Sequence, residues 1–346
     1  MKRFLISVAL ALVSTAVFAQ AGDRDVLVTP EGTIYTLETQ IPSSSTGIEA
    51  TRVLGLAIQN GTEMQRLIVP DSVSAGWHLG GALAYDADSK TLFVLWMHTP
   101  NWMSSELLLT SYRGGKWQPT VSIDNQDYHF RSNLRIGITR HVSQLQKDGT
   151  YADAPALLLH AVWWDQGQGQ SQEARYAMLP VENGSVTPSA IEVHSLQEFV
   201  PADDTYNSVD PNFNAEILRH PAIVSSPLQS TVDVVFGDTK KNSIHTITLH
   251  PIADTRIHIP VGIGGGGGKG GPRSLAAPSS FTADWQGPVT VLSRGDRLVF
   301  ANAGGKALSY ITYSNGTWSD VKSIGIDYRF PAEAALAAID KMVSTQ

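Results

Sequence analysis

Polar side chains recur at one position in the repeated apolar segments of this chain. Each stands two residues beyond an aromatic residue that closes an apolar, β-branched run. If the runs are equivalent strands of repeated sheets, the polar groups meet at one edge of the molecule and can contact one ligand. Asp and Asn also bond nearby backbone N–H groups in loops, so loop capping is the alternative. The residues are His98, Asp165, Asp238 and Asn302, with Gln40 as the equivalent in the first repeat.

Two carboxylates of this set are candidates for catalysis. Asp165 and Asp238 occupy matching positions in adjacent repeats. Two carboxylates about 5–10 Å apart across a sugar can act as acid and base, or as acid and nucleophile. A glycoside hydrolase or lyase that uses Asp165 and Asp238 is therefore one hypothesis.

Cationic and aromatic side chains lie near the expected start of the first strand in several repeats. Arginines there can clamp a carboxylate or phosphate through paired hydrogen bonds, and ion pairing between repeats is the alternative. Aromatic rings on a loop-rich surface can stack against sugars or anchor the loops. Together with the polar set, the candidate ligand-binding residues are His98, Trp102, His129, Arg131, Arg135, Asp165, Arg219, His220, Asp238 and Asn302.

One segment has the alternating oxygen-bearing side chains of a calcium-binding loop. It departs from that pattern at the sixth position, which is Ala215 rather than glycine, and at the twelfth, which is Pro221. The histidines lack the spacing of a zinc site. We therefore expect no cofactor other than a calcium ion at this segment. The candidate calcium ligands are Asp210, Asn212, Asn214 and Glu216.

A tight hairpin recurs along the whole chain. An alternating strand enters a short turn, mostly Asn-Gly or Gly-Gly, and a second strand leaves it. Such turns need positive φ at the central residues, which Asn and Gly tolerate. The fourth copy is degenerate and has Ala253-Asp254 at the turn. The copies are Leu56–Pro70, Thr110–Asp124, Met178–Val193, Ser243–Pro260 and Ile311–Ile324.

A second hairpin precedes each of these, so one repeat contains four short strands. Alternating patterns, β-branched residues and frequent turn signals predict antiparallel sheet. The preceding hairpins are Asp25–Gln40, Gly81–His98, Arg135–Asp165, His220–Asp238 and Gly287–Asn302.

Five four-stranded units predict an all-β fold, a five-bladed β-propeller over residues 22–330. One four-stranded sheet cannot cover both of its faces, whereas blades packed around an axis bury them. A pair of β-sandwiches joined by the glycine-rich Val261–Pro272 is the alternative. Pro331–Val343 predicts a short helix within the tail 331–346, packed on the propeller.

Composition and the N-terminus indicate an exported protein. Lys2 and Arg3 precede the apolar run Phe4–Ala19, and Ala19-Gln20-Ala21 resembles a cleavage site, so residues 1–21 predict a signal peptide. The 16-residue run is shorter than the ~20 residues that a spanning helix needs. The chain has 346 residues, no cysteine and a net charge of −7, which argues against disulfide staples and nucleic-acid binding. We expect a monomer in the periplasm or outside a Gram-negative bacterium, with no membrane span after cleavage.

Three segments resemble parts of sialidase-like propellers of the BNR type. Two are parts of expected blades: Arg219–Asp238 contains RHPAIV and VDVVFGD, and Leu157–Asp165 reads LLLHAVWWD. The third, Tyr313–Trp318 (YSNGTW), is similar to a decayed Asp-box, the S-x-D-x-G-x-T-W hairpin. The resemblance implies the propeller fold and proximity to carbohydrate. It does not imply sialidase activity, because the sequence has neither an intact Asp-box nor an assignable Tyr–Glu pair.

Three functions follow as hypotheses. The first is an exported propeller that binds a glycan or a protein partner through its loop-rich face. The second is the hydrolase or lyase that uses Asp165 and Asp238. The third is a scaffold in envelope assembly that uses the propeller rim and the terminal helix.

Overall fold

The computed structural model shows an all-β protein. Nearly every described element is a strand, and the exception is one 3-10 helix, η3 (Leu196–Phe199). The structure describes residues 24–40, 52–101, 104–125, 129–147, 151–167, 172–188, 191–199, 219–225, 230–238, 243–251, 257–258, 273–274, 289–294, 297–304, 307–314, 317–318 and 322–325.

The strands form five antiparallel sheets, and each sheet is built from strands that follow one another in the chain. The first sheet comprises β1 (Arg24–Val28), β2 (Ile34–Gln40), β3 (Val53–Asn60) and β4 (Glu63–Ile68). The second comprises β5 (Trp77–Asp86), β6 (Thr91–Asn101), β7 (Ser104–Arg113), β8 (Lys116–Trp117) and β9 (Val121–Asp124). The third comprises β10 (His129–Leu145), β11 (Tyr151–Gly167), β12 (Gln172–Glu182), β13 (Ser185–Val186) and β14 (Glu192–Ser195).

The last two sheets repeat the same plan. The fourth sheet comprises β15 (Ala222–Ser225), β16 (Val232–Asp238), β17 (Ser243–Pro251), β18 (Ile257–His258) and β19 (Arg273–Ser274). The fifth comprises β20 (Val289–Arg294), β21 (Arg297–Gly304), β22 (Ala307–Ser314), β23 (Thr317–Trp318) and β24 (Lys322–Gly325).

The outer strand differs between the first sheet and the other four. In the first sheet, β4 pairs with β3 along six residues. In the others the outer position is split, because a two-residue strand and a second short strand both pair with the third strand of the sheet. Short, interrupted edges limit pairing with other chains.

Two of the predicted tight turns form as expected and a third forms with a shift in register, while the turns at Ala253-Asp254 and Asn315-Gly316 lie outside the described residues. Asn183 and Gly184 have φ of 54° and 83°, as the two-residue turn requires, and Gly114-Gly115 behaves likewise. At the first hairpin Asn60 pairs with Glu63, so the central residues are Gly61-Thr62 rather than Asn60-Gly61. Only glycine has positive φ there, which is the requirement of a type II′ turn.

Apolar cores lie between consecutive sheets. Leu83 of β5 joins a core shared with the first sheet, while its neighbours Ala82 and Ala84 join a core shared with the third. Another core lies between the third and fourth sheets, where Trp164 packs near Val234. The second and third sheets are thus covered on both faces, as in stacked blades, whereas a two-layer sandwich buries one face of each sheet.

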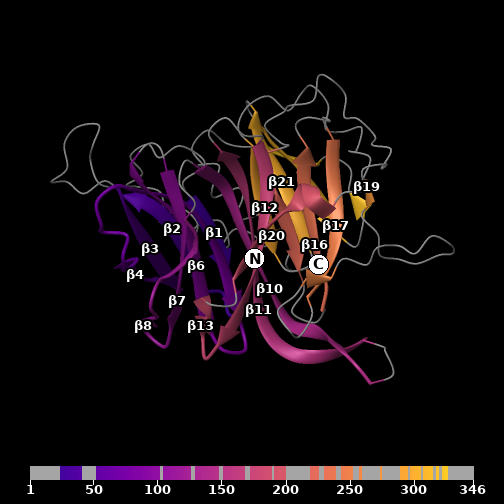
Figure 1. Cartoon of the computed structure of the whole chain (residues 1–346). Helices are drawn as coiled ribbons and strands as arrows, with labels where there is room; N and C mark the ends of the chain where they lie inside the picture. The colour runs from indigo at the N-terminus through magenta and orange to yellow at the C-terminus, as the bar shows by residue number, and fades with distance from the viewer. Residues whose placement is uncertain are drawn as a thin grey trace, which may run out of the picture.

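The first strands of the sheets follow one another through the middle of the molecule. Contacts join β1 to β5, β5 to β10, β10 to β15 and β15 to β20. Figure 1 shows the indigo and purple strands of the first two sheets at the left, β16 and β17 of the fourth sheet at the right, and β20 and β21 of the fifth sheet between β12 and β17 in this view. The hairpin of β10 and β11 runs beyond the other strands at the lower edge of this view.

Several predictions fall outside the described residues. These are the signal peptide, Trp102, the calcium segment 210–216, the glycine-rich 261–272 and the tail helix 331–343. Within the described ranges, the structure contains no helix with the length and apolar character needed to cross a membrane.

Candidate functional site

The candidate site lies at the edge where first strands begin and second strands end. In the second sheet His78 of β5 lies opposite His98 of β6, and in the third sheet Arg131 of β10 lies opposite Asp165 of β11. The antiparallel pairing places the start of one strand beside the end of the next. This pairing brings residues from two predicted sets, the polar strand ends and the cationic strand starts, to the same edge.

Asp165 is the centre of a buried ionic network in the third sheet. One carboxylate oxygen, Oδ1, lies 2.8 Å from Nδ1 of His129, and the other, Oδ2, lies 2.9 Å from Nε of Arg175. Arg175 Nε also lies 2.9 Å from Glu173, which accepts a hydrogen bond from the Ser195 hydroxyl. The Asp165 side chain is 1% exposed and that of His129 is 11% exposed.

This network determines what Asp165 and His129 can do. Oδ1 is bound to His129, whereas Oδ2 has an ion-pair contact with Arg175 that is not a hydrogen bond, so the buried carboxylate orients His129 instead of facing solvent. A neutral His129 that donates from Nδ1 keeps the lone pair on Nε2, which can then accept a proton or a hydrogen bond. This position favours a supporting role for Asp165 behind His129, while its direct role as acid or nucleophile stays a prediction.

Three members of the network were absent from the sequence predictions: Glu173, Arg175 and Ser195. A signal for two of them exists, because Glu173 and Arg175 are two residues apart and so share one face of β12. The cross-strand register then places Glu173 opposite Asp165 and Arg175 opposite Ser195.

Arg131 joins the second sheet to the third. Its side chain is fully buried, and Nε donates to Asp124 at 2.9 Å. Its guanidinium also donates to the backbone carbonyl of Ser105, and the Ser105 hydroxyl donates to the carbonyl of His129. Arg131 therefore holds β10 against β7 and does not present its charge to a ligand, which corrects its assignment as a direct contact.

His98 lies in the second sheet beside a carboxylate and a second imidazole. Its Nδ1 is 2.8 Å from Glu106 Oε1, and its ring stacks on that of His78 at a centroid distance of 4.3 Å. The His98 side chain is 10% exposed and that of Glu106 is 30% exposed. Burial, followed by the nearby His98, lowers the pKa of His78 to about 4.

The remaining predicted residues occupy the same edge of later sheets. Arg135 is half-buried on β10 and donates to the carbonyl of Leu134 at 2.6 Å. Arg219 and His220 are half-buried just before β15, and the carbonyl of Arg219 accepts a hydrogen bond from Asn133.

For Asp238 and Asn302 the structure describes only the position of the backbone. Asp238 ends β16 opposite Ser243, and Asn302 pairs with Val289 and Ser309 near the end of β21. Their side chains lie outside the described part of the structure, and so does all of Trp102. The equivalent residue in the first sheet, Gln40, donates to Glu38 at 3.2 Å.

Metal binding has no support from the described side chains. None of the His, Asp or Glu residues in that part of the chain forms a group of three or more that could hold an ion. The predicted calcium ligands, residues 210–216, are not among them.

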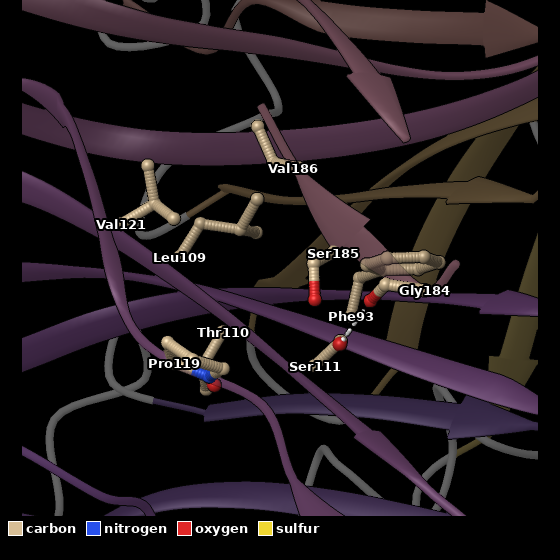
Figure 2. Close-up of a pocket in the computed structure, with 9 residues that line it drawn as sticks. All are labelled: Phe93, Leu109, Thr110, Ser111, Pro119, Val121, Gly184, Ser185 and Val186. Carbon is tan, nitrogen blue, oxygen red and sulfur yellow. Dashed lines mark hydrogen bonds between the residues drawn. The ribbon is translucent and has the colours of Figure 1, made fainter. Parts of the chain in front are cut away.

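A small crevice lies at the opposite edge, between the second and third sheets. Figure 2 shows the ring of Phe93 beside the Gly184 turn and the Ser111 hydroxyl, which donates to the Gly184 carbonyl. Leu109 and Val186 complete its apolar wall. The crevice is therefore part of the contact between sheets, and its lining offers no ionisable group.

Comparison with known proteins identifies similar structures but no family. No family model matches the chain, and no curated protein does. The solved structures include the Hadza microbial sialidase Hz136, which is 12% identical with a TM-score of 0.46. The match covers 88% of this chain and 58% of the sialidase, so the chain spans less than two thirds of it.

Two other similar structures are carbohydrate-active enzymes. The α-L-arabinofuranosidase Arb93A from Fusarium graminearum is 12% identical with a TM-score of 0.40, over 85% of this chain and 72% of that one. A PL25 ulvan lyase bound to an oligosaccharide is 9% identical with a TM-score of 0.43, over 91% of this chain and 72% of that one.

Proposed function

We propose that this chain is an exported five-bladed β-propeller that binds a glycan at the edge formed by first-strand starts and second-strand ends. The observation that carries the proposal is the His129–Asp165–Arg175 network, in which a buried carboxylate fixes an imidazole that is 11% exposed. Fixed donors and acceptors suit sugar hydroxyls, which both donate and accept hydrogen bonds. His98, with its own carboxylate partner, gives the adjacent sheet a second fixed imidazole.

The exposed surface favours a glycan over a protein partner. Docking of a protein commonly uses a contiguous apolar patch of several hundred Å². Among the described residues, large exposed hydrophobic side chains are few: two lie on β4, one in the segment that follows it and one on β10. They are Met64, Ile68, Val73 and Phe130.

Binding of a glycan panel to the purified mature protein tests the proposal. We expect a defined subset of glycans to bind and His129→Gln to weaken that binding at least tenfold. His141→Gln is the matched control, because His141 lies opposite Pro155 near the other end of the β10–β11 pairing, 12 residues along the chain from His129. Failure of every neutral and acidic glycan to bind would exclude this function, and equal loss in both variants would exclude the site.

Catalysis on the bound glycan is the second candidate function. A histidine whose Nδ1 is held by a buried carboxylate has the arrangement of a general base. In this version of the hydrolase or lyase hypothesis, His129 takes the proton, Asp165 supports it and Asp238 is the second carboxylate. Chromatography of the glycan after incubation with wild type or with His129→Gln distinguishes binding from catalysis. If the glycan stays intact with both proteins, the chain binds the glycan without cleaving it.

Export and scaffolding belong to the same proposal. Residues 1–21 act as the signal peptide, and 331–346 pack as a helix on the propeller. Mass spectrometry of the protein from the periplasm should show a mature N-terminus near residue 22. A scaffold role instead predicts an envelope protein that is captured by the full chain and lost on deletion of 331–346.

A further inference from the structure

The segment Val69–Gly76 crosses from β4 of the first sheet to β5 of the second. Its first half is fixed by Ser72, which is buried, donates to the Val69 carbonyl at 2.7 Å and accepts from the Leu54 backbone at 3.1 Å. The middle of the segment is open, since Val73 is 65% exposed. Its second half is held by the Arg52 N–H, which donates to the Gly76 carbonyl at 3.4 Å, and by side chains of the second sheet.

His98 supplies one of these anchors. Its Nε2 lies 2.9 Å from the carbonyl oxygen of Ala75, while Nδ1 lies 2.8 Å from Glu106. Both partners are oxygen acceptors when Glu106 is ionised, so both contacts are hydrogen bonds only if each ring nitrogen carries a proton. The backbone approaches closely here: a Cβ on Gly76 would lie 2.6 Å from the Thr99 carbonyl and 3.1 Å from His98 Nε2.

His78 supplies the other anchor, and its tautomer is fixed. The Trp96 indole can only donate, and it donates to His78 Nδ1 at 3.2 Å. The single proton of a neutral His78 is therefore on Nε2, which contacts the Ser74 hydroxyl at 3.1 Å. Ser74 in turn donates to the Asp71 carbonyl. The segment is thus held by a neutral imidazole and by one that needs two protons.

We infer that His78 and His98 form a proton-dependent latch that holds Val69–Gly76 against the edge carrying the candidate site. Losing one proton from His98 removes either the Ala75 or the Glu106 hydrogen bond. A second proton on His78 would sit on Nδ1, where its N–H would face the Trp96 N–H and break that hydrogen bond. It would also stack two charged imidazole rings at a centroid distance of 4.3 Å. The latch therefore closes at intermediate pH and opens on both sides. It does not depend on the proposed glycan.

The charged groups around the pair agree with this behaviour. His98 faces Glu106 from β7 and His78 from β5. His78 faces His98 from β6 and feels Asp71 from the segment itself. Burial is the main cause that lowers the pKa of His78 to about 4, with the charge of His98 second, and Ser74 and Asp71 partly oppose them. We therefore expect the latch to open in acid near pH 4, where His78 becomes protonated.

A spin label on the segment measures the latch directly. The chain has no cysteine, so Val73→Cys gives one labelling site, and its exposure accommodates the label. Met64→Cys on β4, which is 44% exposed, is the matched control site outside the segment. Electron paramagnetic resonance spectra are recorded from pH 4 to pH 9, with circular dichroism to confirm that each sample is folded.

We expect the Val73 label to be immobile near pH 6 and mobile at both extremes, while the Met64 label does not change. His98→Leu should leave the Val73 label mobile at every pH. Glu106→Gln should make the Val73 label more mobile near pH 6 than in wild type, because Nδ1 of His98 then loses its carboxylate partner. Thr139→Val, which alters the contact of buried His160 in the third sheet, controls for general destabilisation and should leave the label immobile near pH 6. A Val73 label with the same mobility at all pH values in wild type and His98→Leu would overturn the inference.

Discussion

At the residue scale, Asp165 lies between His129 and Arg175, with one carboxylate oxygen facing each. The sequence pattern located Asp165 because it occupies a repeated strand position. Its partner Arg175 depends on the register between β11 and β12, which repeat spacing alone does not determine. The role of Arg131 was missed for a similar reason: its partner Asp124 is seven residues away in the chain but belongs to the preceding sheet.

Replacing Asp165 by Asn tests how much the ionic network contributes to the free energy of unfolding. The variant keeps the shape but leaves His129 and Arg175 with a neutral partner inside the protein. We expect a loss of about 1–3 kcal/mol in the free energy of unfolding, the usual cost of leaving buried polar groups unsatisfied. Urea denaturation followed by tryptophan fluorescence measures it. Asp153→Asn, at an exposed position of β11, should change stability by less than about 0.5 kcal/mol. Equal losses would mean that Asp165 is not engaged as described.

At the element scale, two glycines allow neighbouring sheets to approach closely. A Cβ on Gly81 of β5 would overlap the end of Leu37 from the first sheet. A Cβ on Gly137 of β10 would lie 2.6 Å from the Ser225 hydroxyl and 2.7 Å from Ile223 of the fourth sheet. Hairpin and alternation signals predicted the strands of each sheet. These contacts between sheets, and the split outer strands, depend on packing and were not predicted.

A double-mutant cycle on Gly81 and Leu37 tests that contact. Gly81→Ala should destabilise the protein by about 1–3 kcal/mol through overpacking. Leu37→Ala should cost about 2–5 kcal/mol because it leaves a cavity. The double variant should be more stable than the sum of the two losses predicts, by about 0.5–3 kcal/mol, since the new methyl group enters the space that Leu37 vacates. Additive losses in urea denaturation would show that the two residues do not touch.

At the scale of the whole molecule, two buried neutral histidines connect stability to pH. His160 lies inside the third sheet, with Nε2 2.8 Å from the Thr139 hydroxyl and Nδ1 2.7 Å from the Tyr176 hydroxyl. Burial lowers its pKa to about 3, and the pKa of His78 in the second sheet is lowered to about 4. Burial also raises the pKa of Tyr176, so this cluster is uncharged at neutral pH.

These histidines predict that stability decreases in acid. Both pKa values are lower in the folded protein than the ordinary 6.5, so the unfolded chain binds more protons below about pH 6.5. The free energy of unfolding should therefore fall as pH drops from about 6.5 toward 3, and this contribution should level off below that. Urea midpoints at pH 7.5, 6, 5 and 4 measure the slope, and His160→Gln should reduce it. An unchanged slope in that variant would contradict the assignment of a neutral buried His160.

The order of the sheets has a consequence for how the chain is made. Every sheet is complete within one continuous stretch, and the first spans residues 24–68. A ribosome adds about 5–20 residues per second, whereas a hairpin forms in about 1–10 μs, so local pairing keeps pace with synthesis. Each finished sheet then exposes one apolar face until its successor emerges and covers it. Assembly consequently proceeds in the direction of translation, with the newest face as the part most in need of a chaperone.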